Sequence, residues 1–216
     1  MNKRWNSKDF KIGVLGGGQL GRMLIQEAID LDVHLHMIDS DPNAPCALIA
    51  HSFTHGSITN YDEAIEFGKD KDLITVEIEN VNIEALEALE QKGVKIFPQP
   101  RVLKIIKDKG VQKQFYADHN IPTAPFTLYD NANALKGADI SYPIIQKMRT
   151  GGYDGKGVQL LNTSSESFDA PNLCESLIDF DKELSVIVAR NEDGDVQCFP
   201  SCLLYTSDAA DEGSSV

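Results

Sequence analysis

A glycine turn at residues 16–21, Gly-Gly-Gly-Gln-Leu-Gly, constrains the fold of this chain more than any other feature. The apolar run 11–15 before it is typical of a strand, and residues 22–31 after it have helical apolar spacing. A second strand at 33–38 ends at Asp39. A strand, a glycine turn, a helix and a strand in this order begin a Rossmann-like parallel sheet with an anion-favouring helix start. We therefore predict an α/β first domain.

The rest of the first hundred residues continues this alternation. We expect an extended piece at 47–54, a helix at 62–68, a strand at 73–78, an amphipathic helix at 83–91 and a strand at 94–97. Glu77 and Glu79 lie at the end of the third strand. Parallel strands bind ligands at their carboxyl ends, so these glutamates and the glycine turn should share one crevice.

Asp39 leaves two functions open. With Gly16, Gly18 and Gly21 it fits a dinucleotide fingerprint, in which the acid binds a ribose hydroxyl and the protein is an NAD-binding oxidoreductase module. As an ordinary acid at a strand end near a substrate crevice, it implies no such activity, because fold does not fix function. The second interpretation is favoured.

Two further sets of residues carry side chains that can bind a metal ion. His34 and His36 alternate on a predicted strand and face one side, as a metal pair or, more simply, as a satisfied sheet face. The four cysteines show no zinc-ligand spacing, which predicts reduced thiols. No metal ligand is therefore assigned.

Composition limits the partners. A net charge of −13 argues against nucleic acid, which needs clustered lysine and arginine. Residues 1–11 lack the apolar core of a signal peptide, and no run approaches a membrane span. We expect a cytoplasmic protein with no membrane partner.

The second half is organised around residues 143–157. A short apolar run ends at Lys147, and four glycines follow within seven residues. Such a loop could approach an anion closely, with Lys147 as a phosphate-binding group, or could be an ordinary hairpin turn. Around it we expect a helix at 101–119, strands at 126–129, 158–161 and 183–189, a short helix at 132–138, and a turn at 190–195 after which 196–199 pairs back.

Several separated motifs together resemble a known family. They are the glycine turn at 16–22, the strand end at 77–80, Asp108-Lys109 with Gln112-Lys113, the segment 121–125, the loop 150–157 and the strand 183–190. In this order they resemble the ATP-grasp family of 5-(carboxyamino)imidazole ribonucleotide synthases, the ATPase component of phosphoribosylaminoimidazole carboxylase. The resemblance covers residues 11–200. It implies that ATP phosphorylates bicarbonate, and that the carboxyphosphate carboxylates aminoimidazole ribonucleotide in purine biosynthesis.

The resemblance also implies roles for particular residues. The catalytic residues would be Tyr153, Asp154 and Lys156, facing bicarbonate and the ribonucleotide. ATP would be bound by Lys109, Lys147, Gly152, Gly155, the hinge residues Glu175, Ser176, Leu177 and Ile178, and Glu183 at the ribose. The ribonucleotide would be bound by Gly18, Gln19, Leu20 and Glu77. A sister ATP-grasp family that uses formate and glycinamide ribonucleotide is the alternative within this class.

The resemblance weakens near Ser201, and the residues after it are small, polar and acidic. We expect a substrate-binding domain at 11–100, a connecting helix and linker at 101–125, a partial ATP-grasp small lobe of α+β type at 126–200, and a tail at 201–216 that cannot form a sheet. The Mg²⁺ ligands would lie in a missing C-terminal part, so no turnover is expected of this chain. A full-length protein would be a homodimer.

Overall fold

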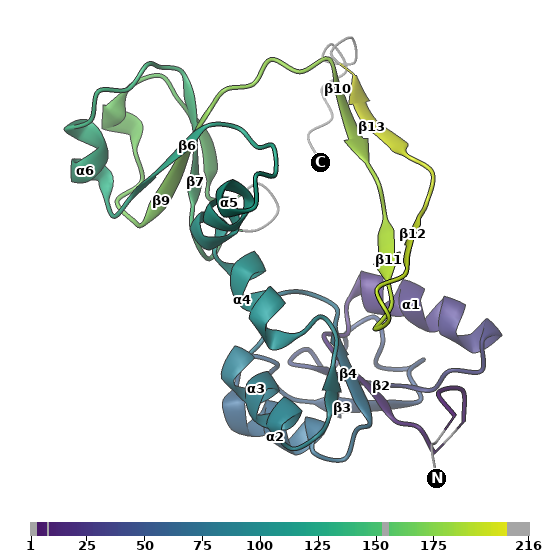
Figure 1. Ribbon diagram of the computed structural model, residues 1–216. Coiled ribbons are helices and arrows are strands. Elements are labelled where there is room, and N and C mark those ends of the chain that lie inside the picture. Colours follow the sequence, from purple (N-terminus) through teal and green to yellow (C-terminus); the bar gives the residue numbers. More distant parts are fainter. Residues whose placement is uncertain (1–3, 8, 153–155, 207–216) are drawn as a thin grey trace.

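A computed structural model describes residues 4–7, 9–152 and 156–206. An α/β unit and an α+β unit are joined by helices α4 and α5, and a long two-stranded arm follows the second unit (Figure 1). The arm runs from the second unit back toward α1 of the first (Figure 1). The α/β class and the two-part organisation agree with the sequence.

The first unit is a five-stranded parallel sheet in the order β3-β2-β1-β4-β5. Its elements are β1 (Ile12–Leu15), α1 (Gln19–Asp30), β2 (Leu35–Asp39), β3 (Ser52–His55), α2 (Tyr61–Gly68), β4 (Leu73–Val76), α3 (Ile83–Gln91) and β5 (Lys95–Ile96). The predicted alternation is confirmed, with strands shorter than expected. The reversal of strand order beside β1 places its carboxyl end, and the glycine turn, at the point where such sheets bind ligands.

Each face of this sheet has its own apolar core. Val14 packs with Ile25 and Met37 on the side of α1. The next residue, Leu15, packs with Leu86 on the side of α2 and α3. Because successive side chains of a strand point to opposite faces, a strand buried on both faces has a continuous apolar sequence, as residues 12–15 do.

The second unit is a four-stranded antiparallel sheet in the order β6-β9-β7-β8. Its elements are β6 (Phe126–Tyr129), α6 (Ala132–Lys136), β7 (Ile144–Met148), β8 (Val158–Leu161), a 3₁₀ turn (Ser164–Glu166) and β9 (Asn172–Ser176). Leu135 of α6, Ile144, Leu161 and Cys174 form its core. The loop predicted at residues 150–157 lies between β7 and β8.

The expectation of one helix over 101–119 is wrong. Two helices, α4 (Pro100–Lys107) and α5 (Lys109–Asp118), meet at Asp108, whose φ of −116° and ψ of 107° are extended. The Asp108 side chain accepts hydrogen bonds from the backbone N–H groups of Gly110 and Val111, as an N-cap does. The capping geometry ends one helix and begins the next.

The arm differs from the sequence expectation in two ways. The strand predicted at 183–189 is divided into β10 (Lys182–Ser185) and β11 (Val188–Arg190), and β12 (Val196–Cys198) pairs back on β11 as expected. Residues beyond 201 were expected to form no sheet, yet β13 (Cys202–Thr206) pairs with β10. Large apolar side chains of the arm are exposed, among them Leu184, Ile187 and Phe199.

The four cysteines are free thiols, two buried and two exposed. Burial raises the pKa of the Cys174 thiol to about 11 and also raises that of Cys46. A thiolate-selective reagent such as a bulky maleimide should therefore label Cys198 and Cys202 in the folded protein and reach all four thiols after denaturation. Mass spectrometry of the labelled protein measures the rate at each cysteine. Labelling of Cys174 as fast as Cys198 would contradict this packing.

Candidate functional site

The carboxylate of Asp39 forms hydrogen bonds with the backbone of its own chain. It accepts hydrogen bonds from the backbone N–H of Gly17 at 2.7 Å and of Asp41 at 2.8 Å. Asp39 thus holds the glycine turn against the end of β2. This arrangement supports the interpretation of Asp39 as a strand-end acid over that of a dinucleotide ribose anchor.

Glu77 contacts the glycine turn, as predicted, whereas Glu79 lines a different cavity, beside Lys109. Glu77 Oε1 accepts a hydrogen bond from the N–H of Gly21 at 3.2 Å. A Cβ at Gly16 or Gly18 would lie 2.6 Å from a carboxylate oxygen of Glu77, so only glycine fits against this side chain. Glu77 therefore occupies part of the anion-favouring start of α1, and an incoming phosphate would meet this carboxylate.

The other residues expected to bind the ribonucleotide lie at the same place. Gly18 is the N-cap of α1 and has no side-chain cap, and Gln19 and Leu20 begin the helix. Both side chains are exposed, Leu20 by 62%. They are therefore free to contact a ligand lying over the start of α1.

Lys109 lies at the boundary between the two units. It is the first residue of α5, and its Nζ donates to the carbonyl of Gly152 at 3.3 Å. A cavity of about 660 Å³ surrounds this contact; it is lined by Ile78, Glu79, Asn80, Ile106, Lys107, Lys109, Gly151 and Gly152. The end of β4 and the loop after β7 thus face one another across a space large enough for a small ligand.

Two lysines converge on Glu175. Lys113 Nζ lies 2.5 Å from Oε1 and Lys147 Nζ lies 2.5 Å from Oε2, and the carboxylate is only 6% exposed. Burial alone would raise the pKa of Glu175, but hydrogen bonds and charge from the two lysines outweigh it and hold the pKa below its ordinary value. Glu175 is thus ionised and fixes the position of the Lys147 ammonium.

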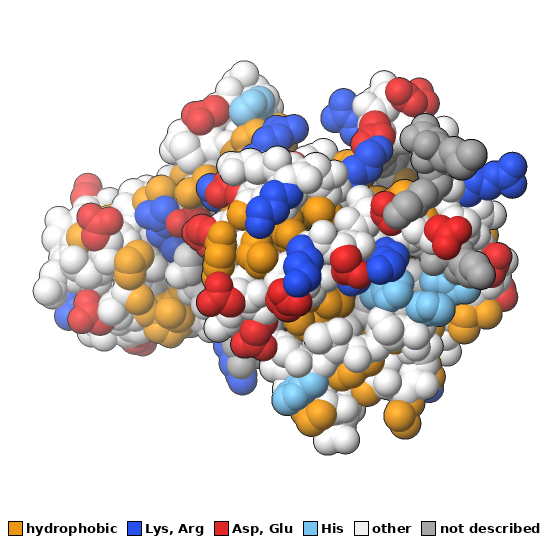
Figure 2. Space-filling model, turned by 90° about the horizontal axis from the view of Figure 1, so that it is seen from below, with side chains coloured by type: hydrophobic (Ala, Val, Ile, Leu, Met, Phe, Trp, Pro, Cys, Tyr) orange, Lys and Arg blue, Asp and Glu red, His pale blue; other side chains and the backbone are white. Residues whose placement is uncertain are grey.

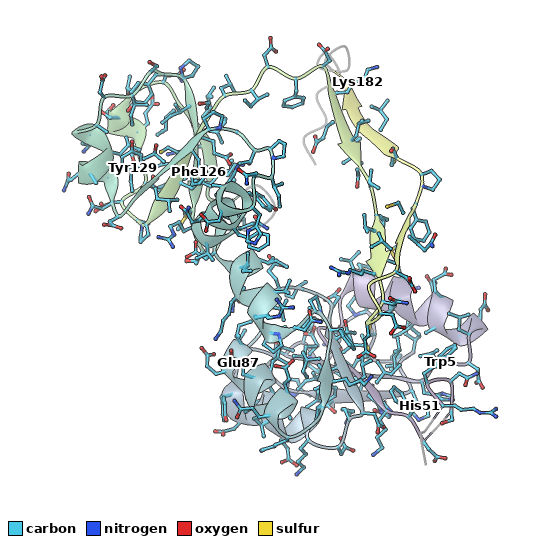
Figure 3. The ribbon with its side chains drawn as sticks, viewed as in Figure 1. Trp5, His51, Glu87, Phe126, Tyr129 and Lys182 are labelled. Atoms are coloured by element: carbon cyan, nitrogen blue, oxygen red, sulfur yellow. The ribbon has the colours of Figure 1, made fainter. Side chains whose placement is uncertain are left out.

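Lys113 was not assigned to the site from the sequence. It follows Lys109 by four residues, which places both side chains on one face of α5. Its ammonium also contacts Thr123 Oγ1 and lies 5.9 Å from the centre of the Phe126 ring, at the start of β6 (Figure 3). The spacing of four residues between Lys109 and Lys113 is the sequence signal that could have assigned Lys113 to the site.

The hinge and ribose residues are only partly brought together. The N–H of Ser176 donates to the carbonyl of Pro125 at 2.9 Å, and Leu177 and Ile178 follow with exposed side chains. Glu183 lies on β10 of the arm, which stands apart from β6–β9 (Figure 1). The structure therefore does not place Glu183 beside Glu175. Figure 3 shows Lys182, its neighbour, at the end of the arm distant from the first unit.

The loop between β7 and β8 is described in part. Tyr153, Asp154 and Gly155 lie outside the described residues. Gly151 has a φ of +76° and Gly157 a φ of +74°, conformations that favour glycine. Lys156 precedes β8 with an exposed side chain.

Other features of the described residues lie apart from this site. The rings of His34 and His51 are 4.7 Å apart, and His36 Nδ1 lies 2.6 Å from Ser52 Oγ, as on a satisfied sheet face. The residues that the structure describes contain no group of three His, Cys, Asp or Glu side chains suited to a metal ion. A larger hollow of about 1560 Å³ adjoins β5 and the β11–β12 turn, where Lys95 and Glu192 pair at 3.0 Å.

The surface carries both signs of charge. Basic and acidic side chains alternate on the face seen in Figure 2, with no continuous basic area over it. None of the helices in the described ranges has the length and apolar content needed to cross a bilayer. Neither feature adds a further site.

Comparison with known proteins identifies the two domains. A ribonucleotide synthetase preATP-grasp domain matches residues 10–107, and an ATP-grasp domain matches residues 114–211. The N5-carboxyaminoimidazole ribonucleotide synthase of Synechococcus elongatus is 34% identical over 88% of this chain and 50% of its own length. The carboxyaminoimidazole ribonucleotide synthase of Aspergillus clavatus, solved with ATP, superposes with a TM-score of 0.84 and 32% identity over 95% of this chain and 56% of that one. This chain joins a ribonucleotide synthetase preATP-grasp domain to an ATP-grasp domain, and it is similar to N5-carboxyaminoimidazole ribonucleotide synthases.

A second structure of the Aspergillus clavatus protein contains ADP and 5-aminoimidazole ribonucleotide; its TM-score is 0.78 at 30% identity, over 95% of this chain and 56% of that one. The chain spans about half the length of these relatives, and 20% to 37% of some longer ones. The ATP-grasp match extends to residue 211, ten residues beyond the expected boundary at 201. Together with β13, it places residues 202–206 within the ATP-grasp domain.

Proposed function

We propose that this chain belongs to an ATP- and bicarbonate-dependent ligase that carboxylates aminoimidazole ribonucleotide through carboxyphosphate. The observation that supports the proposal is that Lys109, which reaches the Gly152 carbonyl, and Lys147, which is held by Glu175, lie on either side of the loop after β7. The N–H of Lys109 donates to the carbonyl of Arg149, two residues beyond Lys147, so both lysines flank the same end of β7. Proteins similar to this chain have been solved with ATP and with ADP and 5-aminoimidazole ribonucleotide.

The chemistry suits these side chains. Phosphoryl transfer depends on positioning and on neutralising charge that develops on the phosphates. Lys109 and Lys147 would bind the phosphates, and Glu175 would keep Lys147 in place through its 2.5 Å contact. Gly18, Gln19, Leu20 and Glu77 would bind the ribonucleotide at the start of α1. Tyr153, Asp154 and Lys156 would face bicarbonate.

The remaining parts of the proposal concern partners outside this chain. Mg²⁺ would accompany the ATP phosphates and be held by side chains other than those the structure describes. The full-length protein would be a cytoplasmic homodimer. The Rossmann-like fold alone would also suit an NAD module, but Asp39 is bound to the backbone of the glycine turn, which disfavours that alternative.

Nucleotide titration tests the proposal. The chain should bind ATP, and Lys147→Ala and Lys109→Ala should each weaken binding about tenfold to a hundredfold, because each removes a charge-assisted phosphate contact of roughly 1.5–3 kcal/mol. Lys109→Ala leaves Glu175 with both of its lysines, so the two variants together distinguish phosphate binding from a local packing change. Lys136→Ala on α6 is the matched control.

Isothermal titration with ATP and with NADH gives the readout. Unchanged ATP affinity in both variants, or tight binding of NADH in place of ATP, would refute the assignment. The ATP and NADH titrations use the same unaltered chain, and Lys136→Ala controls for differences in stability among the variants.

A further inference from the structure

A second charged group joins α5 to the loop after β7. Arg149 Nε donates to Asp108 Oδ1 at 2.9 Å, and Arg149 Nη2 donates to Asp108 Oδ2 at 2.7 Å. The pair is therefore bidentate, the geometry in which guanidinium and carboxylate hold one another most rigidly. Both side chains are about three-quarters buried, with exposures of 26% for Arg149 and 24% for Asp108.

The backbone completes the connection. The N–H of Lys109 donates to the carbonyl of Arg149 at 2.9 Å, and Asp108 Oδ1 also accepts from the N–H of Gly110 at 2.8 Å. The same carboxylate thus caps α5 and anchors Arg149. Lys109 lies between these contacts in the chain, so its backbone has little freedom to shift relative to Gly152, whose carbonyl its Nζ reaches at 3.3 Å.

Gly110 leaves the space that this arrangement needs. A Cβ at Gly110 would lie 2.6 Å from Arg149 Nε and 3.1 Å from Asp108 Oδ1. A side chain at this position would push the guanidinium away, even though alanine suits a helix better than glycine does. The glycine therefore has a packing role that helix propensity does not explain.

Electrostatics favour the charged forms of both partners. Burial would raise the pKa of Asp108, but hydrogen bonds from Arg149, Val111 and Gly110 outweigh it and lower that pKa. The hydrogen bond to Asp108 raises the pKa of Arg149. Both groups stay ionised across the physiological range.

We propose that the Asp108–Arg149 pair and Gly110 are positioning residues for Lys109: they fix the first turn of α5 against the loop after β7 and so aim the Lys109 ammonium at the phosphates of a bound nucleotide. The inference rests on the proposed function and adds three residues to it. None of the three needs to touch the nucleotide.

Three variants test this proposal, and each alters a different one of the three residues. Asp108→Asn keeps a capping side chain but loses the carboxylate, Arg149→Gln removes the guanidinium, and Gly110→Ala introduces the Cβ. Each should weaken ATP binding about tenfold, the effect of a coupling of about 1.4 kcal/mol. Each should leave adenosine binding within about twofold, because adenosine carries no phosphate for Lys109 to reach. Asp118→Asn, at the other end of α5, is the matched control for the lost charge.

A purely structural role predicts a different result, namely equal weakening of ATP and adenosine binding in all three variants. That result, or unchanged ATP affinity, would overturn the proposal. The double variant Asp108→Asn/Arg149→Gln should bind ATP no more weakly than either single variant, since the two substitutions remove the same contact.

Hydrogen exchange separates this proposal from the proposed function. In Arg149→Gln, amides at residues 109–111 should exchange faster than in the unaltered chain, while those of α3 should not change. If the unaltered chain binds no ATP, the proposed function fails for this chain, and the exchange rates still decide whether the pair fixes the start of α5. Unchanged exchange would overturn that part.

Discussion

Replacing Lys113 and Lys147 together by methionine should lower the free energy of unfolding by about 3–5 kcal/mol at pH 7, the usual cost of leaving a buried charge unpaired. The charge in question is the Glu175 carboxylate, which is 6% exposed and has one ammonium 2.5 Å from each oxygen. Methionine preserves much of the lysine volume, so the loss should come from electrostatics and not from a cavity. Urea unfolding followed by circular dichroism measures it.

A third substitution provides the control. Adding Glu175→Leu to the double variant removes the unpaired charge, and well-packed apolar replacements of buried ion pairs are often neutral or stabilising. The triple variant should therefore recover most of the lost stability. If it is as unstable as the double variant, the three residues matter through packing and not through charge.

The contribution of Glu175 to stability depends on pH with opposite signs in the unaltered chain and in the Lys113→Met/Lys147→Met variant. In the unaltered chain the pKa of Glu175 is below its ordinary value of 4.5, so its contribution to stability is present above that pH and is lost as the pH falls through the depressed pKa. Without the lysines, burial would raise this pKa, and protonation would relieve the penalty as the pH falls. The difference in stability between the two should shrink between pH 7 and pH 4. A constant difference would contradict the argument.

The first unit could be predicted well because its signals are local. The apolar runs of β1, β2 and β4 and the glycine turn lie within short windows of sequence, and the alternation of strand and helix then determines a parallel sheet. The contact of Glu77 with the glycine turn was predictable, because the carboxyl ends of neighbouring parallel strands lie at the same edge of the sheet. That Glu77 binds the backbone N–H of Gly21 did not follow, since it depends on a rotamer that only packing selects.

The junction at Asp108 shows why periodicity can mislead. Apolar residues continue at helical spacing through 101–111, so the pattern gives no reason to stop at Lys107. The break comes from a side chain that caps the next helix and pairs with Arg149, forty-one residues later in the chain. Aspartate in an apolar pattern is the local signal, and its partner is not visible in one sequence.

The Lys113–Glu175–Lys147 group is a similar case. Lys147 and Glu175 are on neighbouring strands, with Lys147 opposite Leu173 in the register, while Lys113 is on a helix that covers them. Their contacts require the register of β7 on β9 and the placement of α5, both of which are non-local. The arm shows the same limit, because β13 pairs with β10 through residues that the sequence pattern assigned to a tail.

Changing Gly16 to alanine should lower the free energy of unfolding by about 2–5 kcal/mol, through two separate costs. Gly16 has a φ of +109°, where a side chain costs about 1–2 kcal/mol. Its new Cβ would also lie 2.6 Å from Glu77 Oε2 and 2.8 Å from Glu77 Cβ, and overpacking of this kind typically costs about 1–3 kcal/mol. Chemical denaturation of the two proteins side by side measures the sum.

Gly93→Ala separates the two costs. Gly93 also has a positive φ, +93°, but a Cβ there would have nothing within 4 Å. Gly93→Ala should therefore lower the free energy of unfolding only by the cost of the positive φ, about 1–2 kcal/mol. The difference between the two variants estimates how firmly Glu77 is held against the turn.

The double variant Gly16→Ala/Glu77→Ala completes the comparison. Glu77→Ala removes the carboxylate but keeps the Cβ, so the double variant should recover the part of the Gly16→Ala cost that comes from the 2.6 Å contact with Oε2, after correction for Glu77→Ala alone. If the double variant is as unstable as the sum of the singles, the carboxylate contributes nothing to that cost. A fixed Glu77 has a chemical consequence. The N–H groups of Gly16, Gly17 and Gly21 are then all bound within the protein, so a sugar phosphate at this turn would meet residues 18–20, among them the exposed Gln19.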